Sequence, residues 1–412
     1  MVLIEWVYRV WLGEVMMSGP LTGFSVVDVS SVVSGPLASM IMADQGADVI
    51  KVESPGLGDL TRLPMNLRDG MTGLFANCNR GKRSIVIDLK TDAGRGIVLD
   101  LVKNADVFIE NWRPGAAERL GLGEDSVREA NSDIIYASVS GFGPNGPYSG
   151  QRVYDPVVQA VTGVIAAQIN PRTGVRDLVR NIVADKATSY TLVQAITAAL
   201  LARERGRGGQ RLDVPMLDAT LSFLWPDGMM EETMVGEGVL APTTLSNVYY
   251  LWDTADGQVV AFFASDSEVE GMARALEHPE WLEDETLTDP AQRLQLHNFE
   301  RIAAMIEEVM QNYTTAEIVE RFQEHEVPVA PVLTREEVFE DAQVIHNEAV
   351  YIENHPVYGD VRQPSPGARF SGTPSTRGAL APLHGEHTDA VLRELGYADE
   401  HAAQLRREGV VF

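Results

Sequence analysis

Residues 181–212 read NIVADKATSYTLVQAITAALLARERGRGGQRL, and the rest of the chain is best understood from this stretch. Four large side chains recur at three- and four-residue spacing, as on one face of an amphipathic helix: Tyr190, Val193, Ile196 and Leu200. Three glycines, Gly206, Gly208 and Gly209, then predict the end of the helix.

Asp185 stands near the start of this predicted helix, directly after Ala184. Backbone N–H groups at a helix start orient a carboxylate and favour its ionised form. One interpretation is a plain helix N-cap, because aspartate is among the preferred capping residues. The other is a functional acid, and the window by itself does not separate the two.

The composition restricts the class of function. The chain has 412 residues and a formal charge of -26, which argues against nucleic-acid or anionic-membrane partners. The single cysteine, Cys78, excludes an intramolecular disulfide and a multi-cysteine zinc site, and it suits a reducing, cytoplasmic location. The eight histidines have no HxxxH spacing, so we expect no metal.

The first sixteen residues, MVLIEWVYRVWLGEVM, are apolar but interrupted by charges. They lack the basic start and small-residue cleavage site of a signal peptide, and the apolar run is too short to span a bilayer. We therefore expect residues 1–16 to be an N-terminal extension, with the domain beginning at Met17.

From Gly23 onward, apolar strands alternate with helices. The predicted strands cover residues 24–29, 49–52, 83–89, 107–109 and 134–139. Helices are predicted over 35–42 and 96–102, the first with Pro36 in its first turn. Buried strands separated by helices predict a parallel sheet covered on both faces, which binds ligands beyond the carboxyl ends of its strands.

A dinucleotide site is disfavoured at the first strand-helix turn. That turn reads VSSVVSGPL and has one glycine, whereas close approach to a pyrophosphate requires the GxGxxG pattern. Glu53 has the position of a ribose-binding acid, but the GLGD segment at 56–59 follows the second strand instead of the first.

Basic residues gather near the strand ends of this acidic protein, namely Arg80, Lys82, Arg83, Lys90, Arg113, Arg119 and Arg152. Solvated surface charges are the ordinary interpretation of such residues. Their common position beside strand ends favours a phosphate-binding rim for a nucleotide-like group.

Several ordered segments now point to a family. GPLTGFSVVDVSSVVSGP, GADVIKVESPGLGDLTR, NRGKRSIVIDLK, ENWRPGAAERLGL, SVSGFGPNGPY and VADKATSY resemble the class III CoA-transferase family, which includes formyl-CoA transferase, carnitine CoA-transferase and alpha-methylacyl-CoA racemase. Later segments, among them EHEVPVAPVLTREEVFEDAQV and HPVYGDVRQPSPGARFSGTP, extend the resemblance over roughly residues 17–400.

The resemblance implies an α/β fold, with a Rossmann-like parallel sheet, a smaller α+β domain and an interlocked homodimer. The implied large CoA-binding domain covers residues 17–225, and 226–248 form a linker. The small domain covers 249–332 and contains a strand-turn-strand pattern around Asp256-Gly257. Residues 333–412 are a linker and the C-terminal return to the large domain.

The resemblance also assigns a site. It makes Asp185 the catalytic acid, which favours a functional role over the capping role, and it implies a coenzyme A thioester as substrate with no tightly bound cofactor. The residues that match the family's CoA contacts are Val32, Val33, Ser34, Lys90, Asn111, Arg119, Arg152 and Tyr154. The implied reaction moves CoA from an acyl-CoA to a small carboxylic acid through an anhydride on Asp185.

Two alternative functions on the same scaffold stay open, a 2-methylacyl-CoA racemase and a non-catalytic acyl-CoA or nucleotide binder. Departures from the family pattern restrict the choice. The racemase branch has histidine before aspartate where this chain has Tyr154-Asp155, and tyrosine is a poor proton acceptor near neutral pH. The segment GEGVLAPTTLSN lacks the glycine run of the formyl-CoA transferase lid, and Val33 replaces a glutamine of that enzyme. Both differences argue against an oxalate-type acceptor.

Asp155 fits a second acid-base group or a loop cap.

Overall fold

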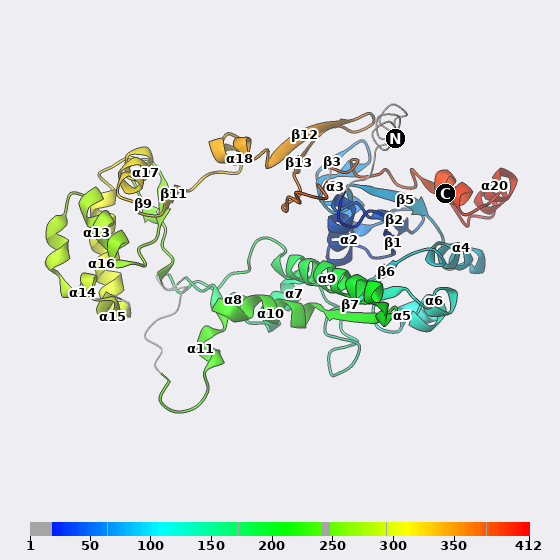
Figure 1. The fold of residues 1–412 in the computed structure, drawn as a ribbon, viewed down its shortest axis with the longest axis horizontal. Coiled ribbons are helices and arrows are strands. Elements are labelled where there is room, and N and C mark those ends of the chain that lie inside the picture. The colour runs from blue at the N-terminus through cyan, green and yellow to red at the C-terminus, as the bar shows by residue number, and fades with distance from the viewer. Residues whose placement is uncertain (1–18, 64, 171–172, 240–247, 294, 376) are drawn as a thin grey trace, which may run out of the picture. The chain divides into compact units, whose positions relative to one another are not determined.

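The computed structural model describes residues 19–63, 65–170, 173–239, 248–293, 295–375 and 377–412 (Figure 1). The predicted N-terminal extension, residues 1–16, lies outside the described residues. The chain divides into two compact units. The first comprises residues up to Thr162 together with Arg180–Leu221 and His346–Phe412, and the second comprises Gly163–Val179 and Ser222–Ile345.

A six-stranded sheet forms the centre of the first unit. Its strands are β1 (Ser25–Asp28), β2 (Asp48–Glu53), β5 (Lys82–Val86), β6 (Val107–Glu110), β7 (Ile135–Ser140) and β8 (Arg211–Pro215). They pair in the order β5-β2-β1-β6-β7-β8, and every pairing is parallel. The predicted parallel sheet is therefore confirmed.

Strand β8 was not among the predicted strands. It is a short edge strand in which Arg211 and Asp213 carry charges, and most of its side chains are only partly buried. An edge strand with one neighbour lacks the continuous apolar run that identifies a central strand in sequence.

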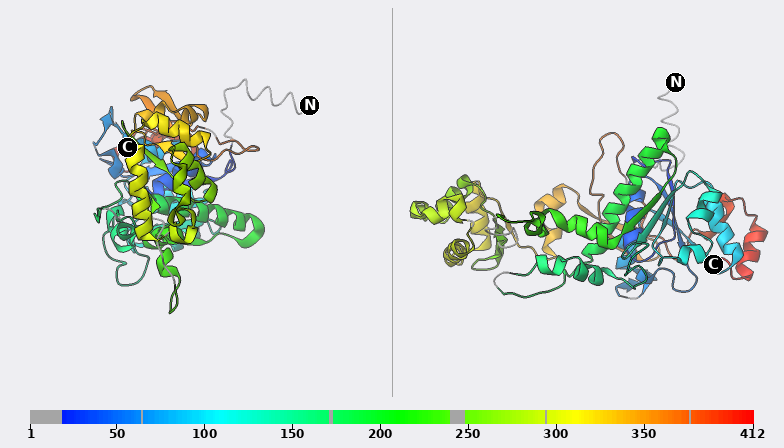
Figure 2. Two further views of the ribbon diagram at one scale, coloured as in Figure 1. Left: turned by 90° about the vertical axis from the view of Figure 1, so that its left-hand side faces the viewer. Right: turned by 90° about the horizontal axis from the view of Figure 1, so that it is seen from below.

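Helices cover both faces of the sheet (Figure 2). One face packs against α2 (Ser34–Asp44) and α9 (Val183–Ala202), and Val26 of β1 points into this core. The opposite face packs against α4 (Asp92–Val102), α6 (Glu124–Ala130), α19 (Thr388–Glu394) and α20 (Asp399–Arg407), and Val27 points into this second core. Successive residues of a strand face opposite ways, so one apolar strand supplies both cores.

The C-terminal residues return to the edge of the sheet. Ile87 pairs with Val411 in an antiparallel bridge, and the His387 N–H donates to the Ser84 carbonyl at 2.9 Å. Smaller elements of the first unit are β3 (Leu67–Arg68), β4 (Met71–Thr72), α3 (Gly73–Asn79), α5 (Ala116–Arg119), α7 (Asp155–Val161), β12 (Val350–His355) and β13 (Gly359–Pro364).

The second unit has its own core. A three-stranded antiparallel sheet, β9 (Trp252–Asp253), β10 (Gln258–Ala261) and β11 (Val329–Pro331), packs with α13 (Asp266–Ala275), α16 (Leu296–Met310) and α17 (Thr315–Glu324). The second unit contains more of the chain than the small domain expected at 249–332. A Cβ on Gly163, before α8 (Val164–Ala167), would meet Met229, so this short helix packs beside the end of α10 (Met216–Gly228).

Helix α9 corrects two details of the sequence interpretation. Its N-cap is Ile182, so Asp185 lies in the first turn and is not the cap. Tyr190 is 60% exposed, and the buried side of the helix is formed by Ala184, Leu192, Ile196, Ala199 and Leu200. The three- and four-residue spacing identified the helix, but the burial of each residue depends on how α9 lies against α2 and the sheet.

Candidate active site

A cleft of about 350 Å³ opens in the first unit beside the carboxyl ends of β1, β6 and β7. It is lined by Ser31, Val32, Ser34, Leu60, Asn111, Trp112, Arg113, Pro114, Val139, Ser140, Gly141, Ser149, Gln151, Arg152, Val153, Tyr154, Asp185 and Met216. In the sheet, β1 lies between β2 and β6, so the connections from β1 and β6 leave in opposite directions along the sheet. Open α/β sheets place ligands at such a reversal of strand order.

Among the described residues, Asp185 is the only acid on the wall of this cleft. The Ser34 hydroxyl, at the start of α2, donates a 2.5 Å hydrogen bond to Asp185 Oδ1. From the other side, the Asp185 N–H donates to Asp155 Oδ2 at 3.0 Å, and Gln159 Nε2 donates to Asp155 Oδ1 at 2.5 Å. The start of α9 is thus held between α2 and α7.

The surroundings of Asp185 raise its pKa above the value of an aspartate in water. Burial raises the pKa of Asp185 to about 6, the nearby Asp155 carboxylate raises it as well, and the Ser34 hydrogen bond opposes both. Within the described part of the chain, Asp185 makes no ion pair. A desolvated acid without a cation in a cleft is a candidate for a reactive group.

The basic residues separate into two groups. Arg113 and Arg152 line the cleft, whereas Lys90 and Arg119 are exposed and do not line it. Lys90 precedes α4, and Arg119 ends α5 with its guanidinium close to Gly115.

The proposed phosphate-binding role of Arg80, Lys82 and Arg83 is wrong. Arg80 pairs with Asp44 at 2.6 Å and Lys82 with Asp28 at 3.0 Å, and all four of these side chains are buried. Arg83 pairs with Asp48 at 2.6 Å. Arg80 and Arg83 lie at the amino end of β5, whereas the cleft lies beside the carboxyl ends of the strands. The Lys82 ammonium reaches beneath the turn between β1 and α2, but there it is bound by Asp28 and by the Pro36 carbonyl at 2.8 Å.

The turn between β1 and α2 contributes three of the predicted CoA contacts. Val32 and Ser34 line the cleft, whereas Val33 is buried as the N-cap residue of α2. Asn111 also lines the cleft, but its side-chain amide bonds the turn itself. Its Oδ1 accepts from the Ser31 N–H at 2.9 Å, and its Nδ2 donates to the Ser31 carbonyl at 2.6 Å.

Tyr154 and Asp155 differ in their surroundings although they are adjacent. Tyr154 is 63% exposed, lines the cleft and is the N-cap residue of α7. Asp155 is buried beneath it and bonds the backbone of Asp185. Sequence reasoning left the role of Asp155 open, because a contact across 30 positions has no local signature.

Other residues near the site were not singled out from sequence. Trp112 lines the cleft after β6, and Asp59 bonds the Val32 N–H from behind the turn. Asp59 is the last residue of the GLGD segment, which follows the second strand and therefore did not fit a dinucleotide-binding turn. Most of the GEGVLAPTTLSN segment, residues 240–247, lies outside the described residues.

Among the described residues, no group of three or more His, Cys, Asp or Glu side chains is arranged to hold a metal ion. No described helix has the length and apolar character needed to cross a membrane.

Comparisons with known proteins agree with one another. A model of CoA-transferase family III matches residues 21–388. The succinyl-CoA:glutarate CoA-transferase of Homo sapiens is 32% identical over 405 residues, covering 95% of this chain and 90% of the human one. The formyl-CoA:oxalate CoA-transferase of Bradyrhizobium diazoefficiens is 30% identical, covering 96% and 98%. A CAIB/BAIF family protein from Brucella suis superposes with a TM-score of 0.79 at 29% identity, covering 92% and 100%.

Proposed function

The chain belongs to CoA-transferase family III and is an enzyme that transfers CoA, and we propose that it does so through a covalent anhydride on Asp185. The donor is an acyl-CoA thioester and the acceptor is a small carboxylic acid. The observation that carries the proposal is Asp185 itself, a buried carboxylate on the cleft wall that hydrogen-bonds Ser34 and makes no ion pair among the described residues.

The proposed chemistry begins with the ionised form of Asp185. Its oxygen attacks the thioester carbonyl carbon, the carbon-sulfur bond breaks, and CoA leaves as a thiolate. The thiolate then attacks the aspartyl carbonyl of the anhydride, which releases the donor acid and leaves CoA on Asp185. An acceptor carboxylate then attacks the carbonyl of this aspartyl thioester, which forms a second anhydride and releases the CoA thiolate. The thiolate attacks the acceptor carbonyl of that anhydride, so the acceptor leaves as its CoA thioester and the Asp185 carboxylate is restored. Since the pKa of Asp185 is about 6, activity should rise with pH through that value.

The surroundings of Asp185 suit these steps. Burial makes the carboxylate more basic than an exposed one, and a more basic oxygen is a better nucleophile. Gly141 lines the same cleft as Asp185, and its N–H is a candidate donor to the oxyanion of each tetrahedral intermediate. Arg113 and Arg152 are the cations of the cleft wall, and we assign them to the CoA phosphates or the acceptor carboxylate.

The CoA contacts implied by the family resemblance remain part of the proposal: Val32, Val33, Ser34, Lys90, Asn111, Arg119, Arg152 and Tyr154. The two CoA-transferase relatives are named for the dicarboxylic acids glutarate and oxalate. Since Val33 and the segment 236–247 argue against oxalate, glutarate is the first acceptor to assay. We further propose an interlocked homodimer in the cytoplasm, supported by the family resemblance, and a monomer mass by light scattering would contradict the dimer.

The experiment that tests the nucleophile compares Asp185→Asn with the wild-type protein. The amide is a very poor nucleophile toward a thioester, so transfer should fall by roughly a thousand-fold or more while the fold is retained. Wild-type protein incubated with acyl-CoA and hydroxylamine should carry a hydroxamate at position 185, seen by peptide mass spectrometry. Asp155→Asn serves as the matched control and should still yield the hydroxamate, because its Asp185 is intact. A folded Asp185→Asn protein with wild-type turnover would exclude the anhydride.

A further inference from the structure

The turn that carries Ser34 toward Asp185 contains a strained residue. Val32 has a φ of 71°, in the left-handed region. The other described non-glycine residues with positive φ are Asp69, Glu277, Glu326 and Glu348, none of which is β-branched. A β-branched side chain disfavours this conformation strongly, and such strain persists only where the surroundings enforce it.

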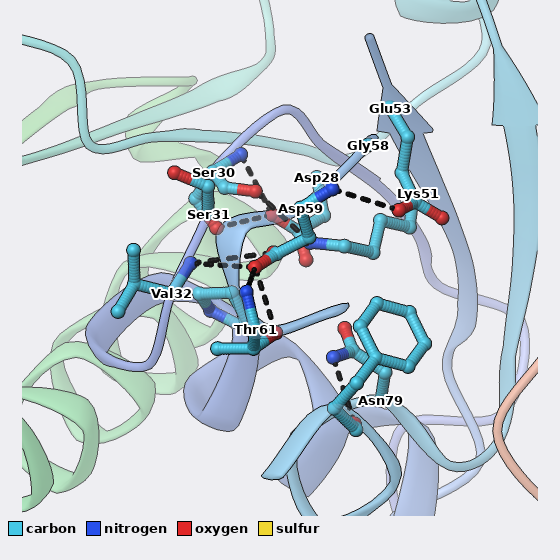
Figure 3. A network of polar contacts seen from close by, with 12 residues as sticks. Asp28, Ser30, Ser31, Val32, Lys51, Glu53, Gly58, Asp59, Thr61 and Asn79 are labelled. Atoms are coloured by element: carbon cyan, nitrogen blue, oxygen red, sulfur yellow. Dashed lines mark hydrogen bonds and ion pairs between the residues drawn. The ribbon is translucent and has the colours of Figure 1, made fainter. Parts of the chain in front are cut away.

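Four side chains hold the main chain of this turn at three consecutive residues. Asp28 Oδ1 accepts from the Ser30 N–H at 3.0 Å. Lys51 Nζ donates to the Ser30 carbonyl at 3.0 Å. The Asn111 amide bonds both the N–H and the carbonyl of Ser31. The Asp59 carboxylate accepts from the Val32 N–H, with both oxygens at 3.2 Å (Figure 3).

Lys51 and Asp59 are themselves joined in a buried ion pair of 2.9 Å. Asp59 also accepts from Thr61, at 2.9 Å from the N–H and 2.7 Å from the hydroxyl, and its own N–H donates to Glu53 at 3.1 Å. Figure 3 shows these groups converging on the turn from β2 and the following loop. Because both members are almost fully buried, the ion pair is a rigid support for Val32.

The turn is also closely packed on its inner side. A Cβ at Gly35 would overlap the Ser30 hydroxyl, which donates to Asp28, so only glycine lets the first turn of α2 lie this close to Ser30. Ser34, two residues after Val32, begins α2 and donates to Asp185 at 2.5 Å. The conformation of Val32 therefore decides where the Ser34 hydroxyl stands.

We propose that Asp59, through its ion pair with Lys51, is a positioning residue that holds Val32 in its strained conformation and so presents Ser34 to Asp185. The inference rests on the proposed nucleophilic role of Asp185. Asp59 does not line the cleft, so its effect on catalysis passes through the turn.

The principal test is Asp59→Asn. Asparagine replaces one acceptor oxygen with a donor, so it cannot bond Lys51, Thr61 and Val32 at once. We expect kcat to fall about ten- to hundred-fold, as displaced catalytic groups typically cause, with a smaller change in KM for acyl-CoA. Adding Val32→Gly should restore most of the lost kcat, because glycine adopts positive φ without support.

The matched control is Asp44→Asn. It breaks another buried ion pair, with Arg80, at the far end of α2 and away from the turn. Its kcat should stay at the wild-type value, even where its melting temperature falls as far as that of Asp59→Asn. An equal loss of kcat in the control would mean that general destabilisation, and not the turn, lowers activity.

A second variant keeps the test valid if Asp59→Asn does not fold. Thr61→Val removes one hydroxyl bond to Asp59 and leaves no buried charge unpaired. It should lower kcat less than Asp59→Asn, and Val32→Gly should reverse the loss. A folded Asp59→Asn or Thr61→Val protein with unchanged kcat, or a loss that Val32→Gly does not relieve, overturns the proposal. Asp185→Asn decides the proposed function separately, because it leaves Asp59, Thr61 and Val32 intact.

Discussion

Two buried aspartates of the same unit, Asp28 and Asp185, have opposite surroundings. Asp28 is fully buried beneath the turn, where Lys82 approaches at 3.0 Å and Ser39 donates at 2.6 Å. Burial alone would raise the pKa of Asp28, but the charges of Lys82 and Lys51 outweigh it and hold the pKa well below its ordinary value. For Asp185, burial is not balanced by a cation, and its pKa is raised.

The comparison shows that charges around one sheet serve two purposes. Paired charges beneath the turn stabilise the fold, and unpaired charges on the cleft wall are available for chemistry. Beneath the turn, acids and bases neutralise one another, as in the Arg62 pair with Glu53 at 2.8 Å. On the cleft wall, Asp185, Arg113 and Arg152 have no ion-pair partner among the described residues. Charges that the protein leaves unpaired are available to a ligand, and the buried one, Asp185, makes the folded state less stable when it is ionised.

The largest expected effect is on stability, for Asp28→Asn. Removing one member of a buried ion pair leaves the other charge uncompensated, which costs about 3–5 kcal/mol of unfolding free energy. The folded pKa of Asp28 is lowered, so its contribution is present above its ordinary value of 3.8 and is lost as pH falls below it. Urea unfolding at neutral pH measures the loss.

Asp399→Asn is the control for that measurement. Asp399 pairs with Arg393 on the surface, where both side chains are largely exposed, and an exposed pair contributes about 0–1 kcal/mol. Losses of similar size in the two variants would remove the distinction between the buried ion pairs and ordinary surface charges.

Asp185→Asn should change the unfolding free energy in the opposite direction and stabilise the protein above the pKa of Asp185. The folded pKa of about 6 exceeds the ordinary 3.8, so the protonated form stabilises the protein fully below 3.8, and this stability is lost as pH rises through 6. At pH 8 the neutral asparagine should therefore increase the unfolding free energy, by up to about 3 kcal/mol. Thermal unfolding at pH 8 and pH 4 tests this, because the gain should disappear at the lower pH. A variant less stable than wild type at pH 8 would show that Asp185 is compensated in the folded state.

The smallest expected effect distinguishes Arg152 from Lys90. Loss of one charged hydrogen bond typically costs about 1.5–3 kcal/mol, so Arg152→Ala should raise KM for acyl-CoA by roughly ten-fold or more. Lys90→Ala should change KM less, because Lys90 does not line the cleft. Steady-state kinetics with acyl-CoA varied gives both values. The reverse order would place the phosphates of CoA beside Lys90, outside the cleft wall.

Sequence alone determined the elements that depend on local pattern. Apolar runs identified five of the six strands of the sheet, and the spacing in 181–212 identified α9 with Asp185 near its start. Family resemblance selected Asp185 among the acids of the chain, and the structure places it on the cleft wall. These features were readable because neighbouring residues in the chain decide them.

Only the tertiary structure decided which charges are paired. Arg80 and Arg152 looked alike in sequence, yet Arg80 meets Asp44 in the interior and Arg152 lines the cleft. Ser34 reaches Asp185 across 151 positions, and Asp59 reaches Val32 across 27. The free energy of a charge depends on the atoms within a few ångströms of it, and the fold brings those atoms from distant parts of the chain.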